Sequence, residues 1–132
     1  MSEPIWLEFD AVIAIHLVLL KEHGGAEGTR DEGLLEAAVA RPQQLFAYED
    51  PKPDLCGMAA AYTTGIVRNH PFVDGNKRTG FVVAGVFLGQ NGLDLVASEV
   101  EATSMVIALA ASEMDEKTFA QWFRERTRPR LS

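Results

Sequence analysis

Apolar residues recur with the period of an α-helix along nearly the whole chain. From Phe9 to Leu20 they follow the i, i+3, i+4, i+7 spacing, and Gly24-Gly25 ends that segment. Residues 76–90 are apolar on nearly every side, which predicts a buried and central helix. Residues 93–96 form at most a short strand. The sequence therefore predicts an all-α fold, a compact bundle of about six helices.

Local signals predict where the other helices begin and end. Asp31 is the expected N-cap of a second helix that runs to about Ala40, where Arg41-Pro42 should stop it. Two prolines and three acidic residues make residues 47–54 an exposed loop. Further helices are expected over residues 55–68, 100–111 and 116–126, the last of them capped by Ser112 or Asp115.

Length and charge limit the classes of protein that remain. At 132 residues the chain is expected to form one domain, residues 1–132. A formal charge of −7 at pH 7 argues against direct binding of nucleic acid, which needs a basic face. The longest apolar stretch, residues 11–20, is too short to cross a membrane. The single cysteine, Cys56, and the lack of a signal peptide favour a reducing, cytoplasmic location with a packed, inert thiol.

Positive charge gathers in two places, at Lys77-Arg78 and near the C-terminus. We interpret the C-terminal group as a solubilising end, with partner binding as the alternative. It consists of Arg124, Arg126, Arg128 and Arg130.

Reactive side chains are densest in residues 70–80, HPFVDGNKRTG, directly before the long apolar segment. A helix N-terminus offers unpaired N–H groups and the positive end of the helix dipole, so it attracts phosphate. Gly75 can turn successive N–H groups toward one anion. Arg78 adds a forked donor and Lys77 a compact charge. The pattern predicts an anion-binding active loop between the third and fourth helices.

Other residues in and near this loop suggest its chemistry. Asp74 is expected to hold Mg²⁺ together with phosphate oxygens. His70 could take the proton of an attacking hydroxyl. Asn76 could orient a phosphate or cap the helix, and Arg68 could add charge to the site or be a solvated cation at a helix end. Phe72 is expected to anchor the loop in the core.

The same residues also have less specific explanations. An exposed turn with an Asp74–Arg78 pair at i, i+4 would contribute only about 0.3–0.5 kcal/mol. A zinc site at His70 and Asp74 lacks a third ligand nearby. A Walker-A loop is excluded, because residues 75–79 lack its glycine spacing and its Gly-Lys-Ser/Thr order. His16, on the apolar face of the first helix, is expected to be a hydrogen-bonded core histidine.

The loop resembles the Fic motif, His-x-Phe-x-Asp/Glu-Gly-Asn-Gly-Arg-x-x-Arg. His70, Phe72, Asp74, Gly75, Asn76 and Arg78 match that pattern. Lys77 stands in place of its second glycine and Phe81 in place of its last arginine, as in the Doc toxins of the Fic/Doc family, whose loop ends Asn-Lys-Arg-Thr. The similarity extends over most of the chain, including residues 30–36 and 40–43. It implies a compact helical Fic/Doc-type domain.

The resemblance also implies an activity and its residues. Doc-like toxins transfer the γ-phosphoryl group of ATP to a threonine of translation elongation factor Tu, which blocks translation. On that model His70 is the general base and Asp74 positions Mg²⁺ or the substrate. Gly75, Asn76, Lys77 and Arg78, with Arg68 as a further candidate, bind ATP or stabilise the transferred charge.

The resemblance leaves two other functions open. Most Fic enzymes transfer AMP to a protein hydroxyl, but Lys77 would occupy the space left by their glycine, and Phe81 cannot grip an anion. A catalytically idle binding module acting through its antitoxin is the third hypothesis. Doc toxins are restrained by a Phd-like antitoxin whose C-terminal segment folds onto the toxin as a helix. The self-inhibitory motif of other Fic proteins is absent, since Lys117 follows the Ser112–Glu116 spacing.

Overall fold

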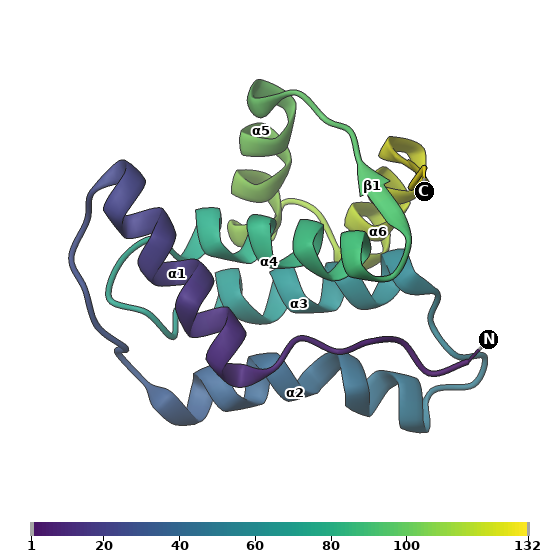
Figure 1. The fold of residues 1–132 in the computed structure, drawn as a ribbon, viewed down its shortest axis with the longest axis horizontal. Coiled ribbons are helices and arrows are strands. Elements are labelled where there is room, and N and C mark those ends of the chain that lie inside the picture. Colours follow the sequence, from purple (N-terminus) through teal and green to yellow (C-terminus); the bar gives the residue numbers. More distant parts are fainter. Residues whose placement is uncertain (1, 132) are drawn as a thin grey trace.

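The computed structural model describes residues 2–131, which form six helices and a two-stranded sheet. The all-α expectation is confirmed, with a small strand pair added at one end (Figure 1). The elements are α1 (Phe9–His23), α2 (Glu32–Tyr48), α3 (Leu55–Asn69), α4 (Asn76–Gln90), β1 (Leu93–Leu95), α5 (Glu99–Ala110), α6 (Glu116–Arg126) and β2 (Thr127–Pro129).

Helix α3 lies at the centre of the molecule and contacts α2, α4, α5 and α6. Figure 1 shows α3 and α4 side by side, with α2 on one side of the pair and α5 and α6 on the other. Small residues make the close packing of α3 possible. A Cβ added at Gly65 would lie 3.1 Å from the Cβ of Ala38 in α2. One at Gly80 of α4 would lie 2.9 Å from Val67 Cγ1.

Helix α2 continues past the proline at which the sequence predicted that it would stop. Asp31 is the N-cap as expected, accepting a hydrogen bond from the Leu34 amide at 3.0 Å. Pro42 lies inside the helix and is buried, so the prediction of an end at Arg41-Pro42 is wrong. The preceding residue is held by tertiary contacts, because Arg41 donates to both carboxylate oxygens of Glu116 in α6. Packing therefore outweighs the local cost of proline.

The C-terminal arginines, interpreted from the sequence as a solubilising end, are mostly paired with acidic residues of the same chain. Strand β2 pairs antiparallel with β1, and Leu95 lies opposite Thr127. Three of the four arginines bind acidic residues far away in sequence. These pairs are Arg124–Asp54, Arg126–Glu101 and Arg130–Asp94.

The remaining helix ends agree with the sequence within about one residue, and α4 and α6 agree completely. Asp115, not Ser112, caps α6, accepting from the Thr118 amide at 2.8 Å. Cys56 is buried as expected, and burial raises the pKa of its thiol, which keeps it protonated and inert. Among residues 2–131, no helix is long and apolar enough to span a membrane.

Candidate functional site in the loop between α3 and α4

The loop begins at His70, which lies at the C-terminal end of α3 in a left-handed backbone conformation. Its φ and ψ are 49° and 54°, and its amide donates to the carbonyl of Ile66 at 3.2 Å. This conformation costs a residue with a Cβ roughly 1–2 kcal/mol, and at helix ends it is normally adopted by glycine. The imidazole is exposed to solvent. The fold therefore holds a strained histidine with its side chain accessible, which is typical of functional sites.

The loop ends at Gly75, which is the N-cap of α4 with a φ of 77°. In the described part of the chain, no side chain caps this helix end. Asn76 is the first residue of the helix, and its amide group pairs with the backbone of Phe72. Its Oδ1 accepts from the Phe72 amide and its Nδ2 donates to the Phe72 carbonyl, both at 3.0 Å. Asn76 therefore closes the loop and is not the cap, so the N–H groups of the first turn stay available to an anion.

Lys77 and Arg78 are both exposed, and within residues 2–131 neither makes a side-chain hydrogen bond or ion pair. Both lie in the wall of a cavity of about 450 Å³. Its other walls are mainly apolar and come from α1, α4 and α5; they include Leu19, Phe81, Val82, Val106 and Ile107. His70 and Asp74 are not part of this wall. Two cations at a helix N-terminus beside a cavity can attract an anionic ligand.

Asp74 is exposed and accepts two backbone hydrogen bonds. Its Oδ1 accepts from the Gly75 amide at 2.8 Å, and its Oδ2 from the Ala26 amide at 3.2 Å. It forms no ion pair with Arg78 in the described part of the chain, so the exposed-turn alternative is not supported. No cluster of three or more metal-ligating side chains occurs among residues 2–131. The single exposed carboxylate suits Mg²⁺ that is mostly held by phosphate oxygens.

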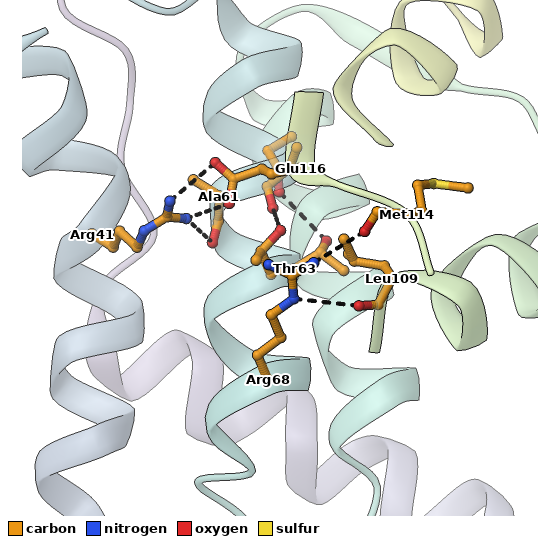
Figure 2. Close-up of polar contacts among 10 residues, drawn as sticks. Arg41, Ala61, Thr63, Arg68, Leu109, Met114 and Glu116 are labelled. Atoms are coloured by element: carbon orange, nitrogen blue, oxygen red, sulfur yellow. Dashed lines mark hydrogen bonds and ion pairs between the residues drawn. The ribbon is translucent and has the colours of Figure 1, made fainter. Parts of the chain in front are cut away.

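Arg68 has a different role from the one predicted for it. Its Nε donates to the carbonyl of Leu109 at 3.3 Å and its Nη2 to that of Met114 at 3.0 Å. Figure 2 shows this guanidinium reaching from α3 to the turn between α5 and α6. Arg68 therefore lies outside the candidate site, because its donors bind one carbonyl near the end of α5 and one in the turn that follows.

Two buried side chains support the loop from the core. Phe72 is 1% exposed, which confirms that it anchors the loop. His16 of α1 stacks on it, with the ring centroids 3.7 Å apart. His16 Nε2 lies 2.8 Å from the carbonyl of Asp74, so this nitrogen carries the proton and donates. The prediction of a hydrogen-bonded core histidine is confirmed, and its partner is the active loop itself.

The segment before α2 also binds the loop, and the sequence predicted no role for it there. The Val73 amide donates to the Gly28 carbonyl at 3.0 Å, and Thr29 forms an isolated antiparallel bridge with Phe72. Arg30 Nε donates to the His70 carbonyl at 2.7 Å. No periodicity reveals such a contact, because it joins residues forty positions apart.

The fold and the candidate site define a class of small helical proteins in which a loop with an exposed histidine leads into the N-terminus of a central helix. Comparison with known proteins identifies the family. Residues 6–88 match the model of the Fic/DOC family. The chain belongs to this family.

Two relatives agree with the family assignment. The chain is 33% identical over 115 residues to the protein named Protein kinase doc of Escherichia phage P1, which covers 87% of this chain and 90% of that relative. It is 50% identical over 74 residues to Toxin Doc of Mycolicibacterium smegmatis (strain ATCC 700084 / mc(2)155). That match covers 56% of this chain and 57% of the relative.

Proposed function

We propose that this chain is the toxin of a toxin–antitoxin system and a protein kinase. It transfers the γ-phosphoryl group of ATP to a threonine hydroxyl of translation elongation factor Tu, and it acts in the cytoplasm, where that target is found. The observation that carries the proposal is the loop between α3 and α4. Within nine residues it combines a helix N-terminus and two cations that have no side-chain partner among residues 2–131, and an accessible histidine. The name of the phage P1 relative, a protein kinase, supports the choice of reaction.

In the proposed reaction His70 accepts the proton of the threonine hydroxyl. The hydroxyl oxygen forms a bond to the γ-phosphorus, and the bond from that phosphorus to the oxygen shared with the β-phosphate breaks. ADP leaves with that electron pair. Lys77 and Arg78 stabilise the charge on the phosphoryl oxygens, and the first-turn N–H groups of α4 add further donors. Positioning and electrostatics account for most catalysis of phosphoryl transfer, so a short cationic loop is sufficient.

The site fits Mg²⁺ and ATP on chemical grounds. Each oxygen of Asp74 accepts one backbone N–H and retains a further lone pair, and the side chain is exposed. A single carboxylate is a normal protein contribution to Mg²⁺, whose other ligands are phosphate oxygens and water. The ion would supply charge neutralisation between the phosphates. Asp74 would hold it, while Gly75 keeps the backbone close to the ligand.

Transfer of AMP is less favoured, because residue 81 is a phenylalanine, whose apolar side chain cannot bind an anion. Phe81 is half-buried, with its ring 6.2 Å from that of Trp122 and 6.5 Å from that of Phe123. It forms an apolar wall of the cavity beside Lys77 and Arg78.

The proposed partner is a Phd-like antitoxin, whose C-terminal helix binds beside the loop.

The test uses ATP labelled at the α- or the γ-phosphate, with Mg²⁺, elongation factor Tu, and either the wild-type chain or His70→Ala. We expect label on the factor from the γ position alone, and a roughly 10²–10⁴-fold lower rate for His70→Ala. Label from the α position would instead make the protein a nucleotidyl transferase. Label from neither position, together with no growth arrest when the wild-type chain is expressed without a partner, would favour an idle binding module.

A further inference from the structure

Arg30 binds three consecutive carbonyl groups at the start of the active loop. Its side-chain Nη2 donates to the carbonyl of Asn69 at 2.8 Å, and its Nε to that of His70 at 2.7 Å. Its backbone amide donates to the carbonyl of Pro71 at 2.7 Å. One residue therefore fixes the backbone immediately before, at and immediately after the histidine.

Two of the carbonyls that Arg30 binds lie at the end of a helix and need a hydrogen-bond donor from outside it. Asn69 is the last residue of α3 and His70 is its C-cap, so neither carbonyl accepts a hydrogen bond from an N–H group of the helix. A guanidinium at this position also faces the negative end of the helix dipole. The left-handed conformation of His70 is unfavourable for a residue with a Cβ and persists only where the surroundings impose it. Arg30 supplies that constraint from a separate segment.

Neighbouring contacts hold Arg30 itself in place. The Asp31 amide donates to the Pro71 carbonyl at 3.1 Å, while the Asp31 side chain caps α2. On the other side, the bridge between Thr29 and Phe72 aligns this segment with the loop. The backbone of Arg30 is therefore anchored at the start of α2, and its guanidinium binds the C-terminal end of α3.

We propose that Arg30 is a positioning residue that sets the conformation of His70 and thereby the placement of the catalytic imidazole. This rests on the proposed function insofar as His70 is the base. Arg30 does not act on the phosphates, because its donors are directed to backbone carbonyls. Its loss should therefore misplace the base while ATP binding by Lys77 and Arg78 is retained.

The experiment compares Arg30→Gln and Arg30→Lys with Arg124→Gln in the full chain. Arg124 is a matched control, because its guanidinium also donates two hydrogen bonds at an end of α3. Its acceptor is Asp54, the N-cap, whereas Arg30 binds carbonyls at the C-terminal end. For Arg30→Gln we expect kcat to fall about tenfold to a hundredfold, as a small misplacement of a catalytic group commonly does. KM for ATP should stay within about twofold, and Arg30→Lys should recover part of the loss by keeping one donor.

Two results would overturn the assignment. One is an equal fall of kcat in Arg30→Gln and Arg124→Gln at matched loss of thermal stability, which would reduce Arg30 to a structural contact. The other is a rise in KM for ATP with kcat unchanged, which would place Arg30 in ligand binding.

Hydrogen exchange gives a readout that does not depend on the kinase activity. In Arg30→Gln we expect the amides of His70 and Phe72 to exchange at least about tenfold faster, with the middle of α3 unchanged. Unchanged exchange at these two amides would contradict the positioning role. If the wild type has no kinase activity but Arg30→Gln still exchanges faster at these amides, the proposed reaction is refuted. The role of Arg30 in fixing the backbone at His70 is then still supported.

Discussion

His16 and Asp74, 58 residues apart, are joined by a hydrogen bond of 2.8 Å from the buried imidazole to the backbone carbonyl. The same ring stacks on Phe72, so one side chain of α1 supports the loop both by packing and by a polar contact. It reaches the carbonyl of Asp74 and leaves the carboxylate of that residue exposed. The loop is thus fixed through its backbone, and the side chains of its candidate site residues remain accessible.

Replacing His16 should separate these two contributions. In His16→Phe the stacking ring is kept and the donor to the Asp74 carbonyl is lost. We expect the free energy of unfolding to fall by about 1–2 kcal/mol, the usual cost of leaving a partly buried acceptor without its partner. Urea denaturation measures this, and His23→Phe, at an exposed site on the same helix, is the control. Equal midpoints for the two variants would argue against the bond contributing to stability.

Two glycines of α4 should respond to alanine in opposite ways. At Gly80 the new Cβ would lie 2.9 Å from Val67 Cγ1 and 3.4 Å from the Thr63 carbonyl oxygen, so Gly80→Ala should destabilise the fold by about 1–3 kcal/mol. At Gly85 the nearest atom is Leu95 Cδ2 at 4.0 Å, so Gly85→Ala should stabilise it by about 0.5–1 kcal/mol through helix propensity. Thermal unfolding compares the pair. Shifts of the same sign would contradict the packing of α3 against α4.

Tyr62 should make the protein less stable at alkaline pH. Burial is the main cause that raises the pKa of this phenol to about 12, from an ordinary value of 10.0. The unfolded chain therefore loses the proton first, so the stabilising contribution is complete below pH 10 and disappears as the pH rises to 12. The loss should be about 2 kcal/mol.

The measurement for Tyr62 is the free energy of unfolding between pH 9 and 12. Tyr62→Phe should remove this part of the pH dependence, although it also removes the acceptor of the Leu7 amide. Tyr48→Phe is the control, because Tyr48 is 86% exposed. An identical slope for the wild type and Tyr62→Phe would be the contrary result.

The cations of the loop should affect ligand binding and leave folding almost unchanged. Lys77→Met and Arg78→Gln each remove an exposed charge with no partner among residues 2–131, so stability should change by less than about 0.5 kcal/mol. Affinity for MgATP should fall about tenfold for each, and added salt should weaken wild-type binding most. Isothermal titration tests this against Arg128→Gln, an exposed arginine on β2. If that control weakens binding as much, the loop is not the anion site.

Much of the candidate site follows from local chemistry. A glycine before an apolar helix, two cations in its first turn and a histidine upstream predict an anion site, and these residues do lie in one loop at the start of α4. The bounds of α4 and the anchoring role of Phe72 were predictable for the same reason. Hydrophobic periodicity and backbone conformation are properties of neighbouring residues, which the sequence records directly.

The errors all involve contacts between distant residues. Pro42 is tolerated where packing holds the helix before it, through buried residues, and after it, through Phe46 against Trp6, and Arg68 binds carbonyls at the end of α5 and in the turn that follows. The arginines near the C-terminus meet their acidic partners only after the chain has folded.

The sequence by itself determined the class of fold, the ends of most helices and the set of candidate residues in the loop. Only the tertiary structure decided how that loop is held, with Arg30 on the carbonyls around His70 and His16 on the carbonyl of Asp74. The physical reason is that these bonds end on backbone carbonyls. Every residue has such a group, so no pattern of side chains shows which of them will be used.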